Sequence, residues 1–406
     1  MTQTVSPATG AGFSHEQRRA LTVLGISQTL GGAGMAAGIT VGALLAQDLL
    51  GSTGLAGLPA ALYTAGAAFG AAGLGRVSRR FGRGPGLALG NGIAALGSAG
   101  VVAGAAARWP VLLLAALFVY GAGTVTGLLA RYAGAELAPP ERRGRAAGTV
   151  LFAMTLGAVV GPNLTGPTGD LAGTWGLPRL TGPFLLAAVA YVAAALVLVV
   201  GLRPDPLPPA PPQAPGAAPT GRPTLGVVTG ATVMITAQLV MIAVMTMTPV
   251  HMADHGHTAQ AVGLVIALHV GAMFLPSPLS GLLADRIGGR RVATAAGAVL
   301  LGAALLAGLA QPTSVPLLAC ALVLLGAGWN LALLGGTAML TDAAPAENRA
   351  AVQGLADVGM SVAGATGGMA SGLVMGGTGY PVLAVAAGAL ALAVVPAVAM
   401  SGSRPT

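Results

Sequence analysis

The chain of 406 residues is 54% hydrophobic and 7% charged, and its mean hydropathy of +0.81 leaves too little polar surface for a protein folded in water. Its net charge of +8 comes from 19 basic and 11 acidic residues. No phosphate-binding loop, nucleophile–base pair or zinc spacing accompanies that charge, which argues against an enzyme. Composition therefore predicts a polytopic membrane protein that is not an enzyme.

Twelve apolar runs of close to 20 residues follow one another along the chain, each long enough for a helix to cross a membrane and too long for a barrel strand. The polar first nineteen residues lack the short apolar core and cleavage site of a removed signal peptide. The predicted helices cover residues 20–46, 55–75, 86–106, 111–133, 145–168, 181–202, 225–250, 260–284, 292–310, 315–340, 350–375 and 380–400. We expect an all-α polytopic membrane protein with twelve transmembrane helices in two six-helix bundles.

The distribution of Arg predicts the orientation. The chain has no Lys, and if both termini are cytoplasmic, all of its 19 Arg except Arg108 and Arg179 fall on or beside the cytoplasmic face. Such an asymmetry is the positive-inside signal of membrane topology. It accounts for the net charge without a nucleic-acid partner.

Two related segments connect the second to the third run and the eighth to the ninth. Residues 281–291, GLLADRIGGRR, match closely the cytoplasmic loop signature of the major facilitator superfamily, and residues 75–83 resemble a degenerate copy. This resemblance implies a transporter built of two repeated halves. Asp285 and Arg286 occupy the gate positions of the signature in the second copy, whereas Arg79 stands where the first copy should have Asp.

Asp357, in the eleventh run, is the acidic residue placed deepest by these spans. It could carry a proton, balance a cation or form a structural ion pair. In the superfamily the first loop packs against the cytoplasmic end of helix eleven, so the resemblance suggests an exchanged charge pair between Arg79 and Asp357.

The fifth run contains Gly148, Gly157 and the segment 161–166, GPNLTG, which resembles the Gly-rich motif of proton-coupled exporters. Small residues at these spacings also let two helices approach closely, and we favour this packing role. The Arg that exporters often carry in helix four is missing, because the position near Leu117 is apolar.

Residues 203–223 are rich in Pro and favour extended or disordered chain over a helix. They predict a cytoplasmic linker between an amino-terminal bundle of residues 1–202 and a carboxy-terminal bundle of residues 224–406.

Two pairs of soft donor side chains lie in the seventh and eighth runs at the same spacing. Met241 and Met245 are four residues apart, and so are His269 and Met273, so each pair stacks on one face of its helix. Counting from positions 250 and 260 puts Met241 level with His269, with Met273 one turn deeper. Thioethers and imidazoles suit a soft monovalent cation such as Cu(I), although Met at this spacing usually serves packing.

The connection between these runs is the predicted outer capture site, with four further soft donors: His251, Met252, His255 and His257. The single Cys320 excludes both an intrachain disulfide and a copper relay built on Cys pairs.

The two motifs at this separation resemble those of the CcoA-like (CalT) copper importers, a branch of the major facilitator superfamily. The resemblance implies import of copper through a bacterial cytoplasmic membrane for cytochrome oxidase assembly, with Met241, Met245, His269 and Met273 as transport ligands. It implies a lipid-embedded monomer with no permanently bound cofactor, and delivery to a cytoplasmic copper chaperone. Two alternatives remain: a proton-coupled drug exporter, and a membrane copper sensor or chaperone that binds without translocating.

Overall fold

The computed structural model describes residues 15–50, 58–203, 205, 224–345, 348–392 and 394, and the regular elements within these ranges are all helical. The helices are α1 (His15–Leu50), α2 (Leu58–Phe81), α3 (Arg83–Ala106), α4 (Pro110–Thr124), α5 (Thr126–Glu136), α6 (Arg143–Asn163), α7 (Thr165–Thr174), α8 (Gly182–Gly201), α9 (Leu225–Asp254), α10 (Ala259–Phe274), α11 (Ser277–Ile287), α12 (Gly289–Leu309), α13 (Val315–Ala343), α14 (Arg349–Thr378) and α15 (Tyr380–Ala391). Two short 3₁₀ turns, η2 (Pro140–Arg142) and η3 (Arg179–Thr181), precede α6 and α8.

Within the described residues, each of the twelve predicted runs falls on one helix or on two consecutive helices; residues 55–57, 393 and 395–400 of these runs lie outside the described ranges. The fourth run divides into α4 and α5 at Val125, and the eighth divides into α10 and α11 at Leu275 and Pro276, where the ring removes a backbone donor. Nine stretches within the described residues are long and apolar enough to cross a membrane. The all-α polytopic prediction is confirmed; the limits of the linker stay a prediction, because most of residues 203–223 lie outside the described ranges.

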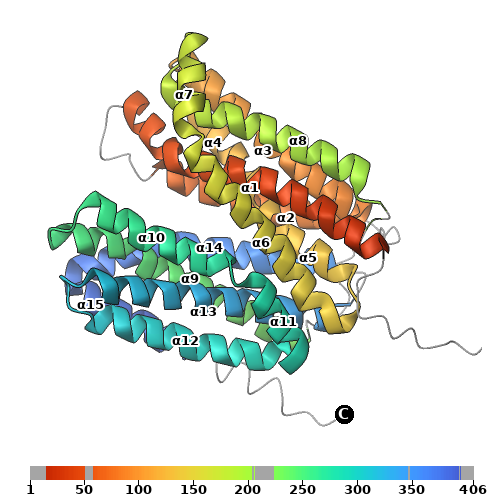
Figure 1. Cartoon of the computed structure of the whole chain (residues 1–406), viewed down its shortest axis with the longest axis vertical. Helices are drawn as coiled ribbons and strands as arrows, with labels where there is room; N and C mark the ends of the chain where they lie inside the picture. The colour runs from red at the N-terminus through yellow and green to blue at the C-terminus, as the bar shows by residue number, and fades with distance from the viewer. Residues whose placement is uncertain are drawn as a thin grey trace, which may run out of the picture.

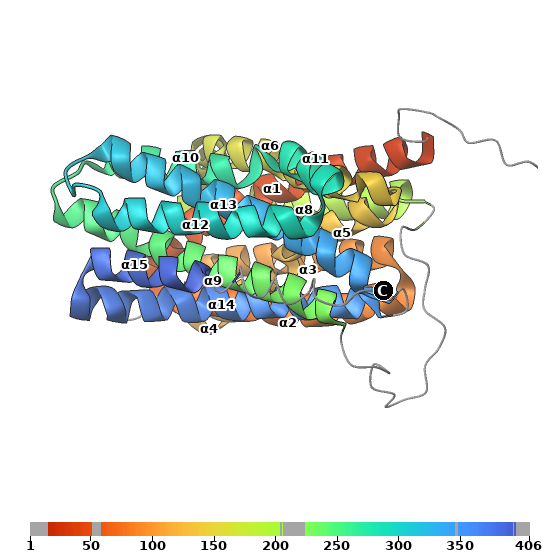
Figure 2. The ribbon, with the colours of Figure 1, turned by 90° about the horizontal axis from the view of Figure 1, so that it is seen from below.

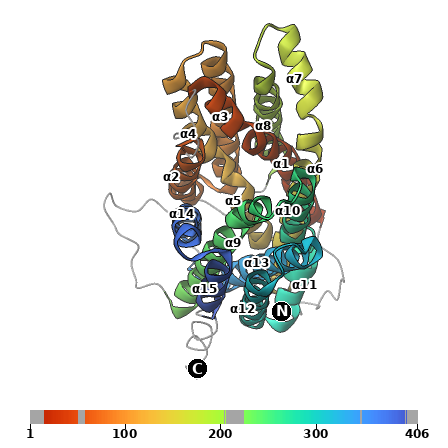
Figure 3. The ribbon, with the colours of Figure 1, turned by 90° about the vertical axis from the view of Figure 1, so that its left-hand side faces the viewer.

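The helices form two groups, α1–α8 and α9–α15, whose long axes run along a common direction (Figures 1 and 2). In Figure 1 the groups meet at the end where α5, α6 and α11 lie and stand apart at the end where α7 and α10 lie. Two seams join them, one between α2 and α14 and one between α6 and α11 (Figure 3). The end that is closed carries the loop signatures and is the predicted cytoplasmic end.

A pair of glycines forms the centre of each seam. A Cβ on Gly281 would overlap the carbonyl oxygen of Gly144, and one on Gly75 would lie 3.1 Å from Cα of Gly354. Gly75 and Gly281 are the first residues of the two loop segments, so the two seams are equivalent positions of the repeat. Close backbone approach between the halves requires glycine here.

The Gly-rich motif of α6 serves packing, as expected from its spacing. A Cβ on Gly157 would overlap the carbonyl oxygen of Thr29 in α1, and one on Gly148 would overlap that of Ser277 in α11. α6 therefore contacts both its own half and the opposite half through positions without side chains.

Candidate functional site

The structure shortens the connection between α9 and α10 to residues 255–258 and thereby changes the predicted depths. Met241 lies 13 residues before the end of α9 at Asp254, and Met273 lies 14 residues after the start of α10 at Ala259. At a rise of about 1.5 Å per residue the two thioethers are level.

The second pair is level as well. Met245 lies nine residues before the end of α9, and His269 lies ten residues after the start of α10. The predicted level of Met241 with His269 is therefore wrong by one turn, because α9 continues through Pro249 instead of ending there. Each level now combines one residue from each sequence motif: Met245 with His269 nearer the connection, and Met241 with Met273 deeper.

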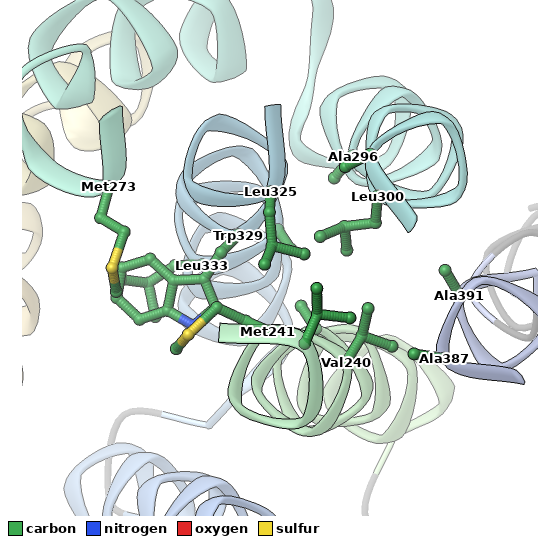
Figure 4. Close-up of a cluster of buried hydrophobic side chains, with 14 of the residues drawn as sticks. Val240, Met241, Met273, Ala296, Leu300, Leu325, Trp329, Leu333, Ala387 and Ala391 are labelled. Atoms are coloured by element: carbon green, nitrogen blue, oxygen red, sulfur yellow. The ribbon is translucent and has the colours of Figure 1, made fainter. Parts of the chain in front are cut away.

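The deeper level is built around an indole. Met241 and Met273 are buried, at 3% and 8% exposure, and both point toward the ring of Trp329 on α13 (Figure 4). Nε1 of Trp329 donates a 2.7 Å hydrogen bond to Oε1 of Gln238, one turn before Met241 on α9. Phe274 packs edge-on against the same indole at a centroid distance of 5.7 Å. The indole toward which both Met side chains point is thus held in place from two sides.

The outer level contains an oriented imidazole. His269 is fully buried, and its Nδ1 lies 2.8 Å from the carbonyl oxygen of Leu322 on α13. Because a carbonyl only accepts, Nδ1 carries the proton and Nε2 keeps its lone pair. Nε2 is buried and has no hydrogen-bond partner among the described residues. Met245 is partly buried and packs against the hydrophobic cluster that contains Met241, Met273 and Trp329. This level offers a lone pair on nitrogen that no donor in the described part of the chain satisfies.

The structure separates the four residues of the predicted capture site. The rings of His251 and His255 lie side by side, with centroids 4.4 Å apart, and His251 also stacks on Tyr380 at 4.3 Å. Met252 is fully buried in the hydrophobic core, and Nε2 of His257 lies 2.8 Å from the carbonyl oxygen of Pro312. Of the four, His251 and His255 are the pair that the structure brings together.

Within the described ranges, no three His, Cys, Asp or Glu side chains gather in an arrangement that could hold a metal ion. Thioether sulfur, which suits soft cations and not hard ones, is the other ligand type that the predicted site residues offer.

A second polar site lies at the closed end, where Asp357 of α14 meets Arg131 of α5. Nη2 of Arg131 donates to Oδ1 of Asp357 at 2.7 Å, and both side chains have no exposed surface. Nε of the same guanidinium donates to Thr337 of α13 at 3.0 Å, and Nη2 also donates to the hydroxyl of Tyr132 at 2.8 Å. The predicted partner of Asp357 was Arg79; the structure instead pairs this carboxylate with Arg131. Gly75 of α2 packs against Gly354, so Arg79, one turn further along α2, lies on the cytoplasmic side of Asp357.

A second set of buried polar side chains lies about one turn closer to the predicted cytoplasmic end. Arg83, at the start of α3, donates from Nε and Nη2 to the two oxygens of Glu136 at 2.9 and 2.8 Å. Its Nη2 also donates to Oε1 of Gln353 on α14, whose own amide donates to Thr341 of α13 at 3.3 Å. The backbone amide of Arg83 donates to Asp205, the first acid of the linker, at 2.7 Å.

On the other seam, Asp285 joins the halves through the backbone. Its carboxylate accepts from the amides of Gly144 and Arg145 at 2.6 and 2.8 Å and so binds the amino-terminal end of α6. A carboxylate at this end is favourable because the first amides of a helix have no partner inside it. Arg286 is exposed beside it. Arg79 stands at the corresponding position of the first segment, and the buried ion pair on that side joins Arg131 of α5 to Asp357 of α14.

Sequence reasoning missed Arg131 and Arg83, which are fully buried, because their charges were counted only as markers of topology. Arg131 falls inside the predicted run 111–133, and an ionisable residue within a membrane helix is a functional candidate. That rule, applied to Arg131 as it was to Asp357, would have found both members of the pair.

Comparison with known proteins agrees with this architecture. The profile described as Major Facilitator Superfamily matches residues 21–250 and 228–406. The chain is 46% identical over 398 residues to the uncharacterized MFS-type transporter YdeG of Bacillus subtilis, covering 95% of this chain and 93% of that protein. It is 31% identical over 353 residues to the riboflavin transporter RfnT of Brucella anthropi, covering 84% and 85%.

Two solved structures share the fold. The human organic anion transporter MFSD10 superposes with a TM-score of 0.78 at 18% identity, covering 94% of this chain and 99% of that one. A bacterial homologue of the iron transporter ferroportin in its outward-facing state superposes with a TM-score of 0.77 at 15% identity, covering 95% and 100%. Members of the superfamily are transporters and not enzymes. Because the profile matches both halves, this chain belongs to the Major Facilitator Superfamily.

Proposed function

We propose that this transporter imports copper, as Cu(I), by alternating access between its two halves. The proposal rests on two levels of soft donors between α9 and α10. Met245 and His269, with its free Nε2, form the outer level. The buried thioethers of Met241 and Met273 form the deeper level. A small number of soft ligands is enough to bind Cu(I), and a thioether does not have to lose a proton to bind it. Copper is the cargo in this proposal, and no resident cofactor is needed.

The charge of the pathway supports a monovalent ion. α9 has no ionisable residue before His251, and α10 has none besides His269. A divalent ion on uncharged ligands inside the membrane would remain poorly neutralised, whereas Cu(I) brings only a single charge. The resemblance to copper importers extends the proposal to a monomer that supplies cytochrome oxidase assembly through a cytoplasmic chaperone.

The orientation completes the proposal. With both termini and the linker in the cytoplasm of a bacterium, the joined end of the helices faces inward and the connection of His251 and His255 faces outward. A cysteine introduced at His255, which is exposed, in a Cys320→Ser background should react with an impermeant thiol reagent in intact cells. Reaction only in inside-out vesicles would reverse the orientation.

Radioactive copper uptake by cells expressing the protein, kept under reducing conditions, tests the function directly. We expect accumulation well above that of cells with an empty vector, and competition by Ag(I), which prefers the same soft ligands. Purified protein that binds copper in vesicles that never accumulate it would indicate a sensor or chaperone. Drug efflux without copper uptake would indicate an exporter.

A second candidate cargo is a small uncharged organic molecule. Gln28, Asn91, Thr124 and Tyr191 line a small gap in the amino-terminal half, with a volume of about 10 Å³. Such groups could pair with the polar edge of a heterocycle, and the relative RfnT is named a riboflavin transporter. Riboflavin uptake measured in the same cells separates the two cargoes.

A further inference from the structure

The interruption between α10 and α11 separates a proposed copper ligand from the contact between the halves. It consists of Leu275 and Pro276. Met273 lies shortly before it and Ser277 directly after it. The carbonyl oxygen of Ser277 is the atom that a Cβ on Gly148 of the opposite half would overlap. The interruption therefore lies between the deeper level of soft donors and the α6–α11 seam.

One side chain of α13 spans this interruption. Nδ2 of Asn330 donates to the carbonyl oxygen of Met273 at 2.7 Å and to Oγ of Ser277 at 2.7 Å. Because a carbonyl oxygen only accepts, the nitrogen of the amide is the atom on this side. Asn330 and Ser277 are both fully buried. A single amide group thus binds both ends of the interruption in a place without water-exposed surface.

Asn330 continues a row of contacts that α13 makes with α10. The carbonyl oxygen of Leu322 lies 2.8 Å from Nδ1 of His269, and a Cβ on Gly326 would lie 2.6 Å from the carbonyl oxygen of His269. Leu322, Gly326 and Asn330 are four residues apart, so they lie on one face of α13. This face orients α10 at the outer level, and Asn330 extends the contact to α11.

The amide of Asn330 is not the most stable side chain for a position that only fills space. Its Oδ1 is buried and has no hydrogen-bond partner among the described residues. An unsatisfied buried acceptor costs stability, whereas an apolar side chain of the same size carries no such cost. What the amide adds is the pair of bonds to Met273 and Ser277.

We propose that Asn330 is a positioning residue that couples the deeper copper level to the seam between the halves. With the amide in place, α10 and α11 move as one body, so a change at Met273 reaches Ser277 and its contact with Gly148. Without the amide, α10 can turn at the interruption while α11 stays in place, because Pro276 has no amide hydrogen to join the two helices. The inference rests on the proposed function, since it assigns the regulation of the same site.

Apolar packing connects the same elements in a second way. Ala147 and Leu151 of α6 belong to the hydrophobic cluster that contains Met273 and Trp329. Such contacts are non-directional and can slide as helices move, whereas a hydrogen bond weakens when its angle changes. Asn330 is therefore the contact that keeps a defined geometry across the interruption.

The separation of the cytoplasmic ends, measured with and without a bound ion, tests the coupling. In a Cys320→Ser background, thioether-linked spin labels replace Arg80 at the end of α2 and Arg291 at the start of α12, both of which are exposed. Pulsed electron paramagnetic resonance in lipid nanodiscs gives the distance distribution. The ion is Ag(I), which is diamagnetic and prefers the same soft ligands as Cu(I). For the otherwise unchanged protein we expect Ag(I) to raise the population of long distances several-fold.

Asn330→Leu keeps the size of the side chain and removes both hydrogen bonds. It should bind Ag(I) with nearly unchanged affinity in calorimetry and lose the change in distance. Its maximal rate of copper uptake at matched protein should fall about tenfold at nearly the same half-saturating concentration, because binding persists while the conformational step fails. Ser277→Ala removes one of the two bonds and should show a smaller loss. The matched control is Ser98→Ala, which removes a buried hydroxyl bonded within α3 and should respond normally.

Pro276→Ala provides a rescue that a packing role does not predict. The backbone at this position, with φ −77° and ψ −2°, is open to Ala, whose amide can donate to the carbonyl oxygen of Ala272 and join the two helices. The double variant Asn330→Leu, Pro276→Ala should therefore recover the change in distance.

The outcomes separate this inference from the proposed function. A preserved response to Ag(I) in Asn330→Leu, loss of Ag(I) binding in that variant, or a double variant with Pro276→Ala that stays unresponsive would overturn the coupling and leave copper import standing. If Asn330→Leu does not fold, a full response in Ser277→Ala overturns the coupling as well, and so does an unsubstituted protein that binds Ag(I) without any change in distance. An unsubstituted protein that binds neither Ag(I) nor Cu(I) would refute the proposed function and the coupling with it.

Discussion

Replacing Met241 and Met273 together by Leu should reduce copper uptake to the level of cells without the transporter, a loss of at least about tenfold. Leu keeps the bulk and apolarity of Met, so the cost in stability should stay under about 1.5 kcal/mol per site. The reason for a large effect on uptake is the removal of both sulfur atoms that point toward Trp329 (Figure 4). The measurement is radioactive copper uptake at matched amounts of protein in the membrane.

The chain supplies a matched control for this experiment. Met234 is on the same helix, is fully buried and packs against Gly336 away from both levels. Met234→Leu should transport normally. At the outer level, His269→Leu should lose uptake, whereas His269→Met should keep part of it, because a thioether can still hold a soft ion. Full uptake by the variant lacking Met241 and Met273 would refute the copper pathway.

Replacing Arg131 by Leu should destabilise the protein by about 3–5 kcal/mol, since it leaves the carboxylate of Asp357 buried without its partner. The pair is fully buried and contacts both halves, so no water is available to replace the lost hydrogen bond. We expect a lower apparent unfolding temperature for the purified variant in detergent. Arg79→Leu, at a half-buried position on α2, should have a much smaller effect.

The double variant Arg131→Leu, Asp357→Leu is the critical comparison. Removing both charges eliminates the unpaired ion, so most of the lost stability should return, and the two substitutions should be strongly non-additive. Additive losses would mean that the two side chains contribute independently, in conflict with the 2.7 Å contact between them.

The residue types of the candidate site could be predicted from the sequence, because a spacing of four residues is a property of a single helix. Met241 and Met273 do lie buried on the faces that their spacing indicated. Their level could not be predicted, because it depends on where α9 ends. Pro usually marks the end of a helix, but Pro249 lies inside α9 and the helix continues to Asp254. A shift of four residues is one turn, enough to exchange the partners between levels.

The ion pair of Arg131 and Asp357 could not be predicted from local sequence patterns, for another reason. The two residues are 226 positions apart and come from different halves, so no periodicity relates them. The loop signature did indicate that a charged contact belongs at this place. The prediction chose Arg79, which stands where the signature has Asp. A sequence motif describes only its own positions, so it could not point to a compensating residue in another helix. The all-helical fold class, in contrast, followed directly from run length and hydropathy.

The glycine seams have a consequence for how easily the molecule changes shape. Where interlocked side chains hold two surfaces together, separation requires many rotamer changes and exposes apolar pockets. Backbone packs directly against backbone where Gly75 contacts Gly354 and where Gly144 contacts Gly281, so no interlocked side chains have to separate there. Such surfaces part and rejoin with little reorganisation, so the two forms can lie close in free energy. The balance then rests on a few polar contacts, and a single bound ion worth a few kcal/mol is enough to invert the populations.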